Sequence, residues 1–316
     1  MKIVSSASIS GKHIAKLQAK LGQLDISVYS SIEEAEAELA EAEILLTYGE
    51  DLNGEILKKC KALRWIMVVS AGLERLPWDE LREQRVLVTN ARGIHRGPMS
   101  EYTLGVMLQL ARRSQELFTL QQQKKWDRTI RVEEIQGKTL GVLGAGSIGQ
   151  EIARKAKVFG MKTLGLNRSG RPIEHFDQIY PTTELNQLLG ACDYLVVVLP
   201  LTKETKHLLG AAEFGRMKES AYLINISRGE VVDEQALIAA IRDKRIAGAV
   251  LDVFCQEPLP VDSPLWDLDG VVITPHLSSR STLYMERAME IFADNLTVFL
   301  QGYGEMRNII DLSKGY

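Results

Sequence analysis

The fold is decided by one stretch, Lys138-Thr-Leu-Gly-Val-Leu-Gly-Ala-Gly-Ser-Ile-Gly149, in which a short apolar run meets a glycine-rich loop. The run up to Leu143 has the length of a strand, and the residues from Ser147 to Phe159 have the apolar spacing of a helix. A G-x-G-x-x-G loop between a strand and a helix is typical of dinucleotide-binding folds. The sequence therefore predicts a doubly wound α/β fold built on a parallel sheet.

The glycine loop also predicts where the phosphates of a dinucleotide bind. Gly144 allows a tight turn, Gly146 leaves room for a pyrophosphate, and Gly149 lets the helix approach the strand. Ser147 and Ile148 open the helix, whose N-terminal amides favour an anion. We therefore expect these five residues to bind the cofactor.

The turn after the next predicted strand indicates which dinucleotide is used. The run Lys162–Leu166 ends at Asn167-Arg168-Ser169, about twenty residues beyond the loop, where NAD-binding folds place an acidic residue against the ribose hydroxyls. Asn167 has no charge to repel a 2′-phosphate, and Arg168 and Ser169 offer it donors. NADPH is therefore the expected cofactor. The alternative is an ordinary solvated basic turn that accepts NAD.

Composition narrows the class of protein. The chain has 316 residues, of which 45% are apolar and 25% charged, and this suits two compact domains with sizeable cores. A net charge of -3 with scattered basic residues gives no positive field for nucleic acid. The three cysteines lack metal-ligand spacing, and neither a signal peptide nor a membrane-spanning apolar run is present. These features predict a cytoplasmic protein with no metal, no nucleic-acid partner and no membrane association.

Apolar runs and helical patterns alternate along the chain, which predicts parallel sheets. The acidic run from Glu33 to Glu41 is interpreted as the solvent-exposed face of a helix. One long helix is expected from Met99 to about Gln123, and a terminal helix is expected from Ser281 to Gln301. The expected strands are 2–5, 44–47, 64–69 and 86–89, then 138–143, 162–166, 194–199, 221–226, 247–253 and 271–274.

The predicted organisation is two Rossmann-like or flavodoxin-like doubly wound domains with a cleft between them. Residues 98–283 would form the dinucleotide-binding domain, and residues 1–97 with 284–316 would form a discontinuous substrate domain. Ligands of such sheets bind at the carboxyl ends of the strands, so catalytic side chains are expected there.

Three polar residues follow predicted strands and together indicate hydride-transfer chemistry. Arg228, in Asn225-Ile-Ser-Arg-Gly229, offers a fork of donors that suits a carboxylate. His276, in Thr274-Pro-His276, is suited to donate a proton to a ketone oxygen as hydride reaches the carbon. Glu257 supplies a carboxylate that fixes the tautomer of an imidazole and stabilises its charged form. Each residue alone is compatible with an ion pair, a core histidine or a loop glutamate, so the prediction depends on their combination.

On these residues the chain resembles the D-isomer-specific 2-hydroxyacid dehydrogenase family over essentially its whole length. The motifs that carry the resemblance are the glycine loop, Leu199-Pro-Leu-Thr202, Asn225-Ile-Ser-Arg-Gly-Glu230, Gly248-Ala-Val-Leu-Asp-Val-Phe254, Glu257-Pro258 and Pro275-His276. The resemblance implies that Arg228 orients a 2-keto acid, that His276 is the acid/base and Glu257 its partner, and that a homodimer forms largely on the Met99 helix. Further cofactor contacts are expected from Leu199, Pro200, Thr205, Ile226, Ser227, Arg228, Asp252, His276 and Ser278.

The stretch Val69-Ser-Ala-Gly-Leu73 resembles the family's substrate loop, whose backbone amides hold the substrate carboxylate. Ser70, Ala71 and Gly72 are therefore predicted to bind substrate together with Arg228 and His276. The turn at Asn167 resembles that of NADPH-dependent glyoxylate and hydroxypyruvate reductases, which makes these small 2-keto acids the expected substrates.

Some features depart from the family or separate its branches. Ser278 and Ser279 stand where many members have alanine or glycine. A formate dehydrogenase pairs the histidine with glutamine, so Glu257 argues against that branch. Many phosphoglycerate dehydrogenases have a regulatory domain that the sequence up to Tyr316 does not predict, so a role in serine biosynthesis is less expected.

Two questions stay open in the sequence. The first is whether the protein is instead a cofactor-sensing binding protein, because transcriptional corepressors resemble this family. The sequence favours an enzyme, since it has every catalytic residue type and no segment with the composition of a disordered tail. The second is which keto acid binds, since the candidate pocket residues are equally compatible with surface or packing roles. Those candidates are Tyr48, His95, Arg96 and Trp126. Cys255, near Glu257, is either redox-sensitive or a buried inert thiol.

Overall fold

The structure, a computed structural model, describes residues 1–70, 72–73 and 75–313, which divide into two compact units. One unit comprises Met1–Ile94 together with the described residues from Ser281 onward, and the other is His95–Arg280. The chain passes from one unit to the other after Ile94 and after Arg280, whereas the predicted boundaries follow residues 97 and 283.

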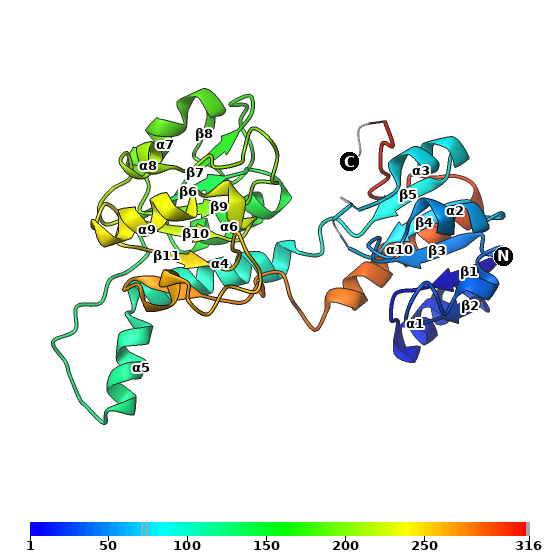
Figure 1. Cartoon of the computed structure of the whole chain (residues 1–316), viewed down its shortest axis with the longest axis horizontal. Coiled ribbons are helices and arrows are strands. Elements are labelled where there is room, and N and C mark those ends of the chain that lie inside the picture. The colour runs from blue at the N-terminus through cyan, green and yellow to red at the C-terminus, as the bar shows by residue number, and fades with distance from the viewer. Residues whose placement is uncertain (71, 74, 314–316) are drawn as a thin grey trace. The chain divides into compact units, whose positions relative to one another are not determined.

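The first unit contains a five-stranded parallel sheet with the strand order β2-β1-β3-β4-β5 (Figure 1). Its strands are β1 (Lys2–Ser5), β2 (Asp25–Val28), β3 (Ile44–Thr47), β4 (Trp65–Val68) and β5 (Leu87–Asn90). This is the flavodoxin-like order, in which the direction of winding reverses between β1 and β3. The strands β3 and β4 are buried along their whole length because helices cover both faces.

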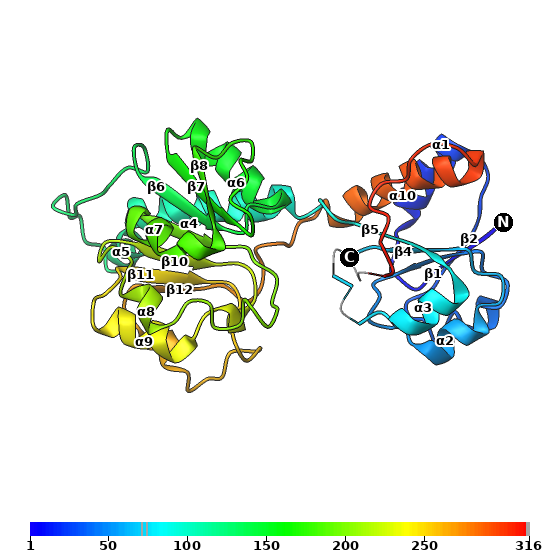
Figure 2. The same cartoon turned by 90° about the horizontal axis from the view of Figure 1, so that it is seen from above.

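Helices from both ends of the chain cover the first sheet. They are α1 (Gly11–Leu21), α2 (Gly54–Lys59), α3 (Trp78–Gln84) and α10 (Tyr284–Gln301). Figure 2 shows α1 and α10 on one face of the sheet and α2 and α3 on the other. Trp65 of β4 stacks on Phe292 of α10, with 5.1 Å between the ring centroids. The C-terminal helix is therefore part of the core that the N-terminal strands begin.

The second unit contains a seven-stranded parallel sheet with the order β12-β11-β10-β9-β6-β7-β8. Its strands are β6 (Thr139–Leu143), β7 (Lys162–Asn167), β8 (Gln178–Pro181), β9 (Tyr194–Val197), β10 (Tyr222–Asn225), β11 (Gly248–Leu251) and β12 (Val271–Ile273). The chain winds outward from β6 to β8 and then crosses to β9, so the switch point lies between β6 and β9. These two sheets confirm the predicted α/β class with two doubly wound parallel sheets.

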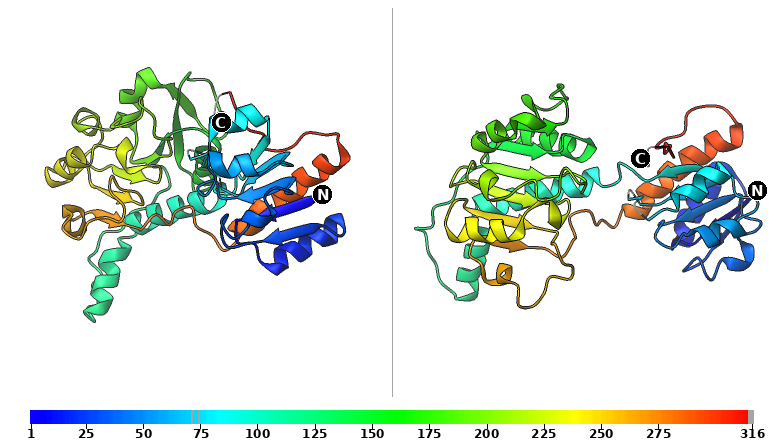
Figure 3. Two further views of the ribbon diagram at one scale, coloured as in Figure 1. Left: turned by 45° about the vertical axis from the view of Figure 1, so that its right-hand side comes forward. Right: turned by 45° about the horizontal axis from the view of Figure 1, so that its top comes forward.

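Helices cover both faces of the second sheet as well. The covering helices are α4 (Arg96–Ala111), α6 (Ser147–Val158), α7 (Leu185–Ala191), α8 (Ala211–Phe214) and α9 (Glu234–Arg242), and this unit also contains α5 (Ser114–Gln122). The helices α4 and α6 pack on one face, whereas α7, α8 and α9 pack on the other (Figure 2). Figure 3 shows α5 projecting from the rest of this unit, and none of its residues is buried. No helix in the described part of the chain is long and apolar enough to span a membrane.

The prediction of a single helix from Met99 to Gln123 is wrong. Helix α4 begins at Arg96, so Pro98 occupies the first turn, where its missing N–H needs no partner. The helix ends at Ala111, whose carbonyl oxygen accepts the N–H of Glu133 at 2.7 Å instead of continuing the helical ladder. Arg113 then adopts a left-handed φ of 54°, and α5 starts as a separate helix.

The acidic run also differs from its prediction, because Glu33–Glu41 forms turns and a short 3-10 helix (η1, Glu36–Glu38). Glutamates spaced three and four residues apart repel one another on an α-helix, which disfavours that form. Ala35 and Leu39 are nevertheless buried, so the segment still covers the sheet. The edge strands β2 and β8 were not predicted, since short, partly exposed edge strands lack a continuous apolar run. Three further 3-10 helices are η2 (Thr182–Glu184), η3 (Gly229–Val231) and η4 (Pro264–Asp267).

Candidate active site

The glycine loop joins β6 to α6 at the switch point of the second sheet. Gly144 has a φ of 107°, and a Cβ there would lie 2.7 Å from the carbonyl oxygen of Val198, so the turn requires glycine. A Cβ on Gly149 would overlap the carbonyl oxygen of Gly144. By contrast, a Cβ on Gly146 would have no protein atom within 4 Å. This space in front of the N-terminal amides of α6 fits a phosphate group of a dinucleotide.

Alanine at two of these glycines is expected to separate folding from cofactor binding. Gly149→Ala forces the helix away from the strand and should lower the free energy of unfolding by about 1–3 kcal/mol, as overpacking does. Gly146→Ala meets open space, so its free energy of unfolding should stay within about 0.5 kcal/mol of wild type. Its affinity for a dinucleotide should fall at least about tenfold, because the methyl group occupies the phosphate's place. Urea denaturation and cofactor fluorescence measure the two quantities, and unchanged affinity in Gly146→Ala would contradict the phosphate site.

Asn167, the last residue of β7, builds the turn that carries Arg168. Its Oδ1 accepts hydrogen bonds from the N–H groups of Ser169 (3.0 Å) and Gly170 (2.6 Å). Its Nδ2 donates to the carbonyl oxygen of Arg171 at 2.9 Å. A carboxylate in this place would lose the second interaction and add a negative charge. The turn therefore leaves Arg168 and Ser169 exposed, with the uncharged side chain of Asn167 at its base. Glu204 lies close enough to Arg168 for the charge of the arginine to contribute to lowering the pKa of the glutamate.

The segment after β9 lies against the glycine loop. Cδ2 of Leu199 would be 3.4 Å from a Cβ at Gly144. The hydroxyl of Thr205 donates to the carbonyl oxygen of Pro200 (2.7 Å) and accepts the N–H of Thr202 (2.7 Å). Thr205 thus holds the shape of the segment, while Pro200 remains exposed.

Arg228 follows β10, and the buried Asn225 fixes the backbone that carries it. Oδ1 of Asn225 accepts the N–H (3.1 Å) and the hydroxyl (2.9 Å) of Ser227. Its Nδ2 donates to the carbonyl oxygen of Arg228 at 3.1 Å, and the Arg228 side chain is exposed. Ile226 directs its side chain into the core. Asn225 was not among the predicted site residues, although a polar residue at the end of an apolar strand is a recognisable signal.

Gly229 brings the Arg228 segment against the loop that carries Glu257. A Cβ on Gly229 would overlap the backbone carbonyl of Phe254 and the backbone nitrogen of Cys255. The backbones of the two loops therefore lie in direct contact at Gly229, and no larger residue fits there. The sequence analysis did not identify Gly229 as a positioning residue. Its φ is not unusual, and glycine is required there only because the backbone of another loop packs against it.

His276 and Glu257 form the central pair of the site. Nδ1 of His276 lies 2.8 Å from Oε2 of Glu257, and Oε1 of Glu257 accepts the N–H of Phe254 at 3.0 Å. Because Nδ1 is engaged by the carboxylate, Nε2 is the ring atom available for proton transfer. His276 has a φ of 53°, a conformation that costs a non-glycine residue roughly 1–3 kcal/mol. Its N–H bonds to the carbonyl oxygens of Asp252 (2.9 Å) and Thr274 (3.0 Å) hold it there.

Asp252 is a carboxylate with 0% exposure beneath the His276 loop. Its Oδ1 accepts the N–H of Leu277 (2.8 Å), and its Oδ2 accepts the N–H of Ser278 (2.9 Å). Both oxygens are thus used to fix the loop, and a contact of Asp252 with the cofactor stays a prediction. Ser278, another predicted cofactor contact, is itself buried.

The predicted substrate loop belongs to the first unit and follows β4. The Ser70 hydroxyl donates to the carbonyl oxygens of Tyr48 (3.3 Å) and Gly72 (3.1 Å), which ties the loop to the segment after β3. Ala71 lies outside the described residues. The side chain of Tyr48 is 39% exposed, so it remains a candidate for contact with substrate.

The remaining pocket candidates fall in the second unit. Burial lowers the pKa of His95; a hydrogen bond with the backbone of Ser279 opposes this shift, and the charge of Arg228 adds to it. Arg96 pairs with Glu151 at 3.5 Å between α4 and α6. Trp126 is 92% exposed. Of these residues, only His95 is coupled to the predicted catalytic groups.

Cys255 is exposed, so the alternative of a buried thiol is wrong. Partial burial and the acidic side chains of Glu234, Glu230 and Asp233 raise the pKa of its thiol to about 11. The thiolate is the reactive form of cysteine, and the raised pKa leaves little thiolate at neutral pH.

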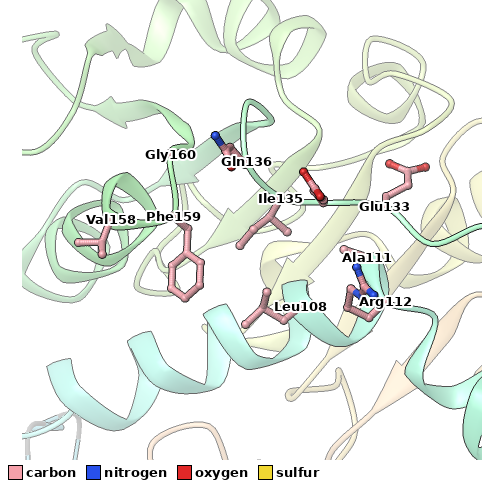
Figure 4. A pocket seen from close by; sticks show the side chains of 10 residues that line it. Leu108, Ala111, Arg112, Glu133, Ile135, Gln136, Val158, Phe159 and Gly160 are labelled. Carbon is pink, nitrogen blue, oxygen red and sulfur yellow. The ribbon is translucent and has the colours of Figure 1, made fainter.

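A hollow of about 500 Å³ lies at the far end of α6 from the glycine loop. Figure 4 shows Leu108, Ile135 and Phe159 around it, contributed by α4, the segment before β6 and the end of α6. It contains none of the predicted site residues, so we do not assign the chemistry to it.

Known proteins are similar to this chain in sequence and in fold. The family model for the D-isomer specific 2-hydroxyacid dehydrogenase NAD binding domain matches residues 104–278. A glyoxylate/hydroxypyruvate reductase B from Citrobacter koseri is 38% identical over 281 residues, which cover 86% of each chain. A solved 2-hydroxyacid dehydrogenase family protein from Aeromonas salmonicida is 37% identical, with a TM-score of 0.83 over 98% of this chain and 99% of its own. A D-isomer specific 2-hydroxyacid dehydrogenase from Xanthobacter autotrophicus, solved with NADPH and MES, is 28% identical, with a TM-score of 0.80 over 100% and 99% of the two chains. The chain therefore belongs to the D-isomer specific 2-hydroxyacid dehydrogenase family and is an NAD(P)-binding oxidoreductase.

Proposed function

We propose that the protein reduces small 2-keto acids, such as glyoxylate or hydroxypyruvate, to D-2-hydroxy acids with NADPH as the reductant. The observation that carries this proposal is the His276–Glu257 pair, joined at 2.8 Å in the same unit as the glycine loop. The Citrobacter koseri relative, named a glyoxylate/hydroxypyruvate reductase, supports the substrate class.

The three catalytic residues divide the chemistry between them. In the reductive direction, charged His276 donates the Nε2 proton to the ketone oxygen. Glu257 holds the ring through Nδ1 and stabilises its charge before the transfer. The guanidinium of Arg228 binds the carboxylate of the keto acid and stabilises negative charge that develops on the keto oxygen. In the oxidative direction, neutral His276 accepts the proton of the hydroxy acid.

The glycine loop, the N-terminus of α6 and the Asn167 turn would hold the dinucleotide. The space at Gly146 and the donors at Arg168 and Ser169 fit its pyrophosphate and 2′-phosphate respectively. Bound there, its nicotinamide would supply the hydride to the keto carbon. In the first unit, Ser70 and Gly72, with Ala71, would bind the carboxylate of the substrate.

The test of this function is the oxidation of NADPH and of NADH with glyoxylate, hydroxypyruvate, pyruvate and a branched 2-keto acid. Wild type should prefer NADPH. Arg168→Ala should lower the ratio of kcat/KM for NADPH over NADH about tenfold, because the 2′-phosphate loses a charged donor. Absorbance of the reduced cofactor follows both reactions.

Arg242→Ala is a matched control, because Arg242 is an exposed arginine in the last turn of α9 at the amino-end side of the same sheet. Its cofactor ratio should equal that of wild type. An unchanged ratio in Arg168→Ala would remove Arg168 from the cofactor site. Tight dinucleotide binding without turnover of any keto acid would instead favour a sensing protein.

We also infer that two copies of the chain associate through the α4–α5 region. Leu117 and Phe118 of α5 are 42% and 61% exposed, and the highly exposed Trp126 follows α5. Apolar side chains gathered on a projecting element gain free energy when a partner covers them. A second copy of the chain is the partner that the family resemblance implies.

A further inference from the structure

We propose that Tyr102 of α4 positions His276 through a chain of two hydroxyl groups that ends on the buried carboxylate of Asp252. The inference rests on the proposed acid/base role of His276. It assigns no contact with substrate to Tyr102, whose effect is transmitted through the loop that holds His276.

The hydrogen bonds of this chain have one consistent direction. Oη of Tyr102 lies 2.7 Å from Oγ1 of Thr274, and Oγ1 of Thr274 lies 2.5 Å from Oδ1 of Asp252. The hydroxyl of Thr274 donates its single proton to the carboxylate of Asp252. The hydroxyl of Tyr102 must therefore donate to Thr274. Each donated bond polarises the next, which strengthens the interaction with the carboxylate.

Asp252 needs these donors because it is fully buried. A buried carboxylate is stable only when hydrogen bonds replace its lost water, and here the donors are Thr274 and the N–H groups of Leu277 and Ser278. Two of the three donors are therefore the backbone amides that directly follow His276. A shift of the carboxylate moves the backbone of the catalytic loop with it.

His276 is sensitive to such a shift because its backbone is strained. Its φ of 53° persists only while its surroundings hold it, and the carbonyl oxygen of Asp252 accepts its N–H at 2.9 Å. The pair with Glu257 depends on that backbone, since a loop that relaxes carries Nδ1 away from the carboxylate.

Tyr102 is suited to anchor the chain. It lies in α4, a helix of 16 residues whose inner face is buried against the sheet and α6. Burial, with the nearby charge of Asp252, raises the pKa of Tyr102 to about 12, so its hydroxyl remains a donor throughout the working pH range. The hydrogen bonds from Tyr102 through Thr274 to Asp252 thus connect the loop that holds His276 to the packed helix α4.

Tyr102→Phe tests the proposal, because it removes the first donor and keeps the ring. We expect kcat for keto acid reduction to fall roughly 10-fold, since small displacements of a catalytic group have effects of this size. The KM values for keto acid and dinucleotide should change less than about twofold. Tyr194→Phe is the matched control: Tyr194 is a buried tyrosine at the start of β9 that stacks on Tyr222, and its kcat should equal that of wild type.

Variants of Thr274 distinguish the effect of the hydrogen-bond chain on kcat from the effect of side-chain packing. Thr274→Ser keeps the hydroxyl and should retain wild-type kcat, whereas Thr274→Val should lower kcat at least as much as Tyr102→Phe. The double variant with Tyr102→Phe and Thr274→Val should be no slower than Thr274→Val alone, because both changes break one chain.

Two results would overturn the proposal: wild-type kcat in Tyr102→Phe, or losses in Tyr102→Phe and Thr274→Val that multiply in the double variant. If Tyr102→Phe has a folding defect, its Tm will be lower than that of wild type. In that case, wild-type kcat in Thr274→Ser together with a low kcat in Thr274→Val still supports the proposed hydrogen-bond chain. If His276→Ala itself keeps wild-type activity, the proposed function fails instead, whatever the behaviour of Tyr102.

Discussion

His276→Ala should lower kcat for keto acid reduction about 10³-fold, within the range that general acid catalysis contributes. The variant lacks the imidazole that Glu257 holds at 2.8 Å, so solvent must protonate the ketone oxygen instead. Dinucleotide affinity should fall far less than kcat, because the variant loses one expected cofactor contact while the glycine loop and the Asn167 turn are untouched. Absorbance of the reduced cofactor under saturating substrate measures kcat, and fluorescence titration measures affinity.

His175→Ala is the control for this variant. His175 has a φ of 71° and lies in the same unit, but its carbonyl oxygen accepts the hydroxyl of Thr163 near the start of β7, at the opposite edge of the sheet. Its kcat should equal that of wild type. In the wild type, His276 must donate a proton during reduction and accept one during oxidation, so the two directions should depend on pH in opposite senses. A single pH profile shared by both directions would remove His276 from the acid/base role.

Arg228→Ala should lower kcat/KM for glyoxylate about 10²–10³-fold, the loss typical for removing one charged donor from a developing oxyanion. Arg228→Lys should recover only part of this loss, because an ammonium group is a point charge without the planar fork that matches a carboxylate. The backbone of Arg228 is fixed by Asn225 and Gly229, so both substitutions should leave the free energy of unfolding unchanged within about 0.5 kcal/mol.

A neutral aldehyde serves as the matched substrate for the arginine variants. It lacks the carboxylate, so its slow reduction should fall much less in Arg228→Ala than the reduction of glyoxylate. Equal losses for both substrates would show that Arg228 acts on the reacting oxygen alone. Wild-type kcat/KM for glyoxylate in Arg228→Lys would contradict recognition by the guanidinium fork.

The central strands and the glycine loop could be predicted because their signals are local. Strands such as β6 and β10 are buried on both faces, so they appear in the sequence as continuous apolar runs bounded by turns. The break between α4 and α5 could not be predicted in this way. It depends on a hydrogen bond from the N–H of Glu133 to the carbonyl oxygen of Ala111, and these two residues lie far apart in the sequence. The edge strand β2 alternates polar and apolar residues over only four positions, too few to separate it from a loop.

In the candidate site, too, residues with a local sequence signal could be predicted and residues that act through distant contacts could not. Arg228, Glu257 and His276 follow strands or lie in short motifs, so their residue types and order were sufficient to propose them. The residues that hold them act over long separations: Tyr102 and Thr274 are 172 residues apart. The role of Gly229 likewise exists only because another loop passes against it. No local pattern distinguishes such residues from ordinary core or surface positions.

The packing of α10 on β4 has a consequence for synthesis on the ribosome. The unit from His95 to Arg280 is continuous in sequence, so all of its strands have been made before the last helix emerges. The five strands of the other unit are made first, yet the face that carries Trp65 stays uncovered until Phe292 leaves the exit tunnel. The earliest part of the chain to be translated is therefore the last to complete its core, and during that interval it is the part most exposed to chaperones and proteases.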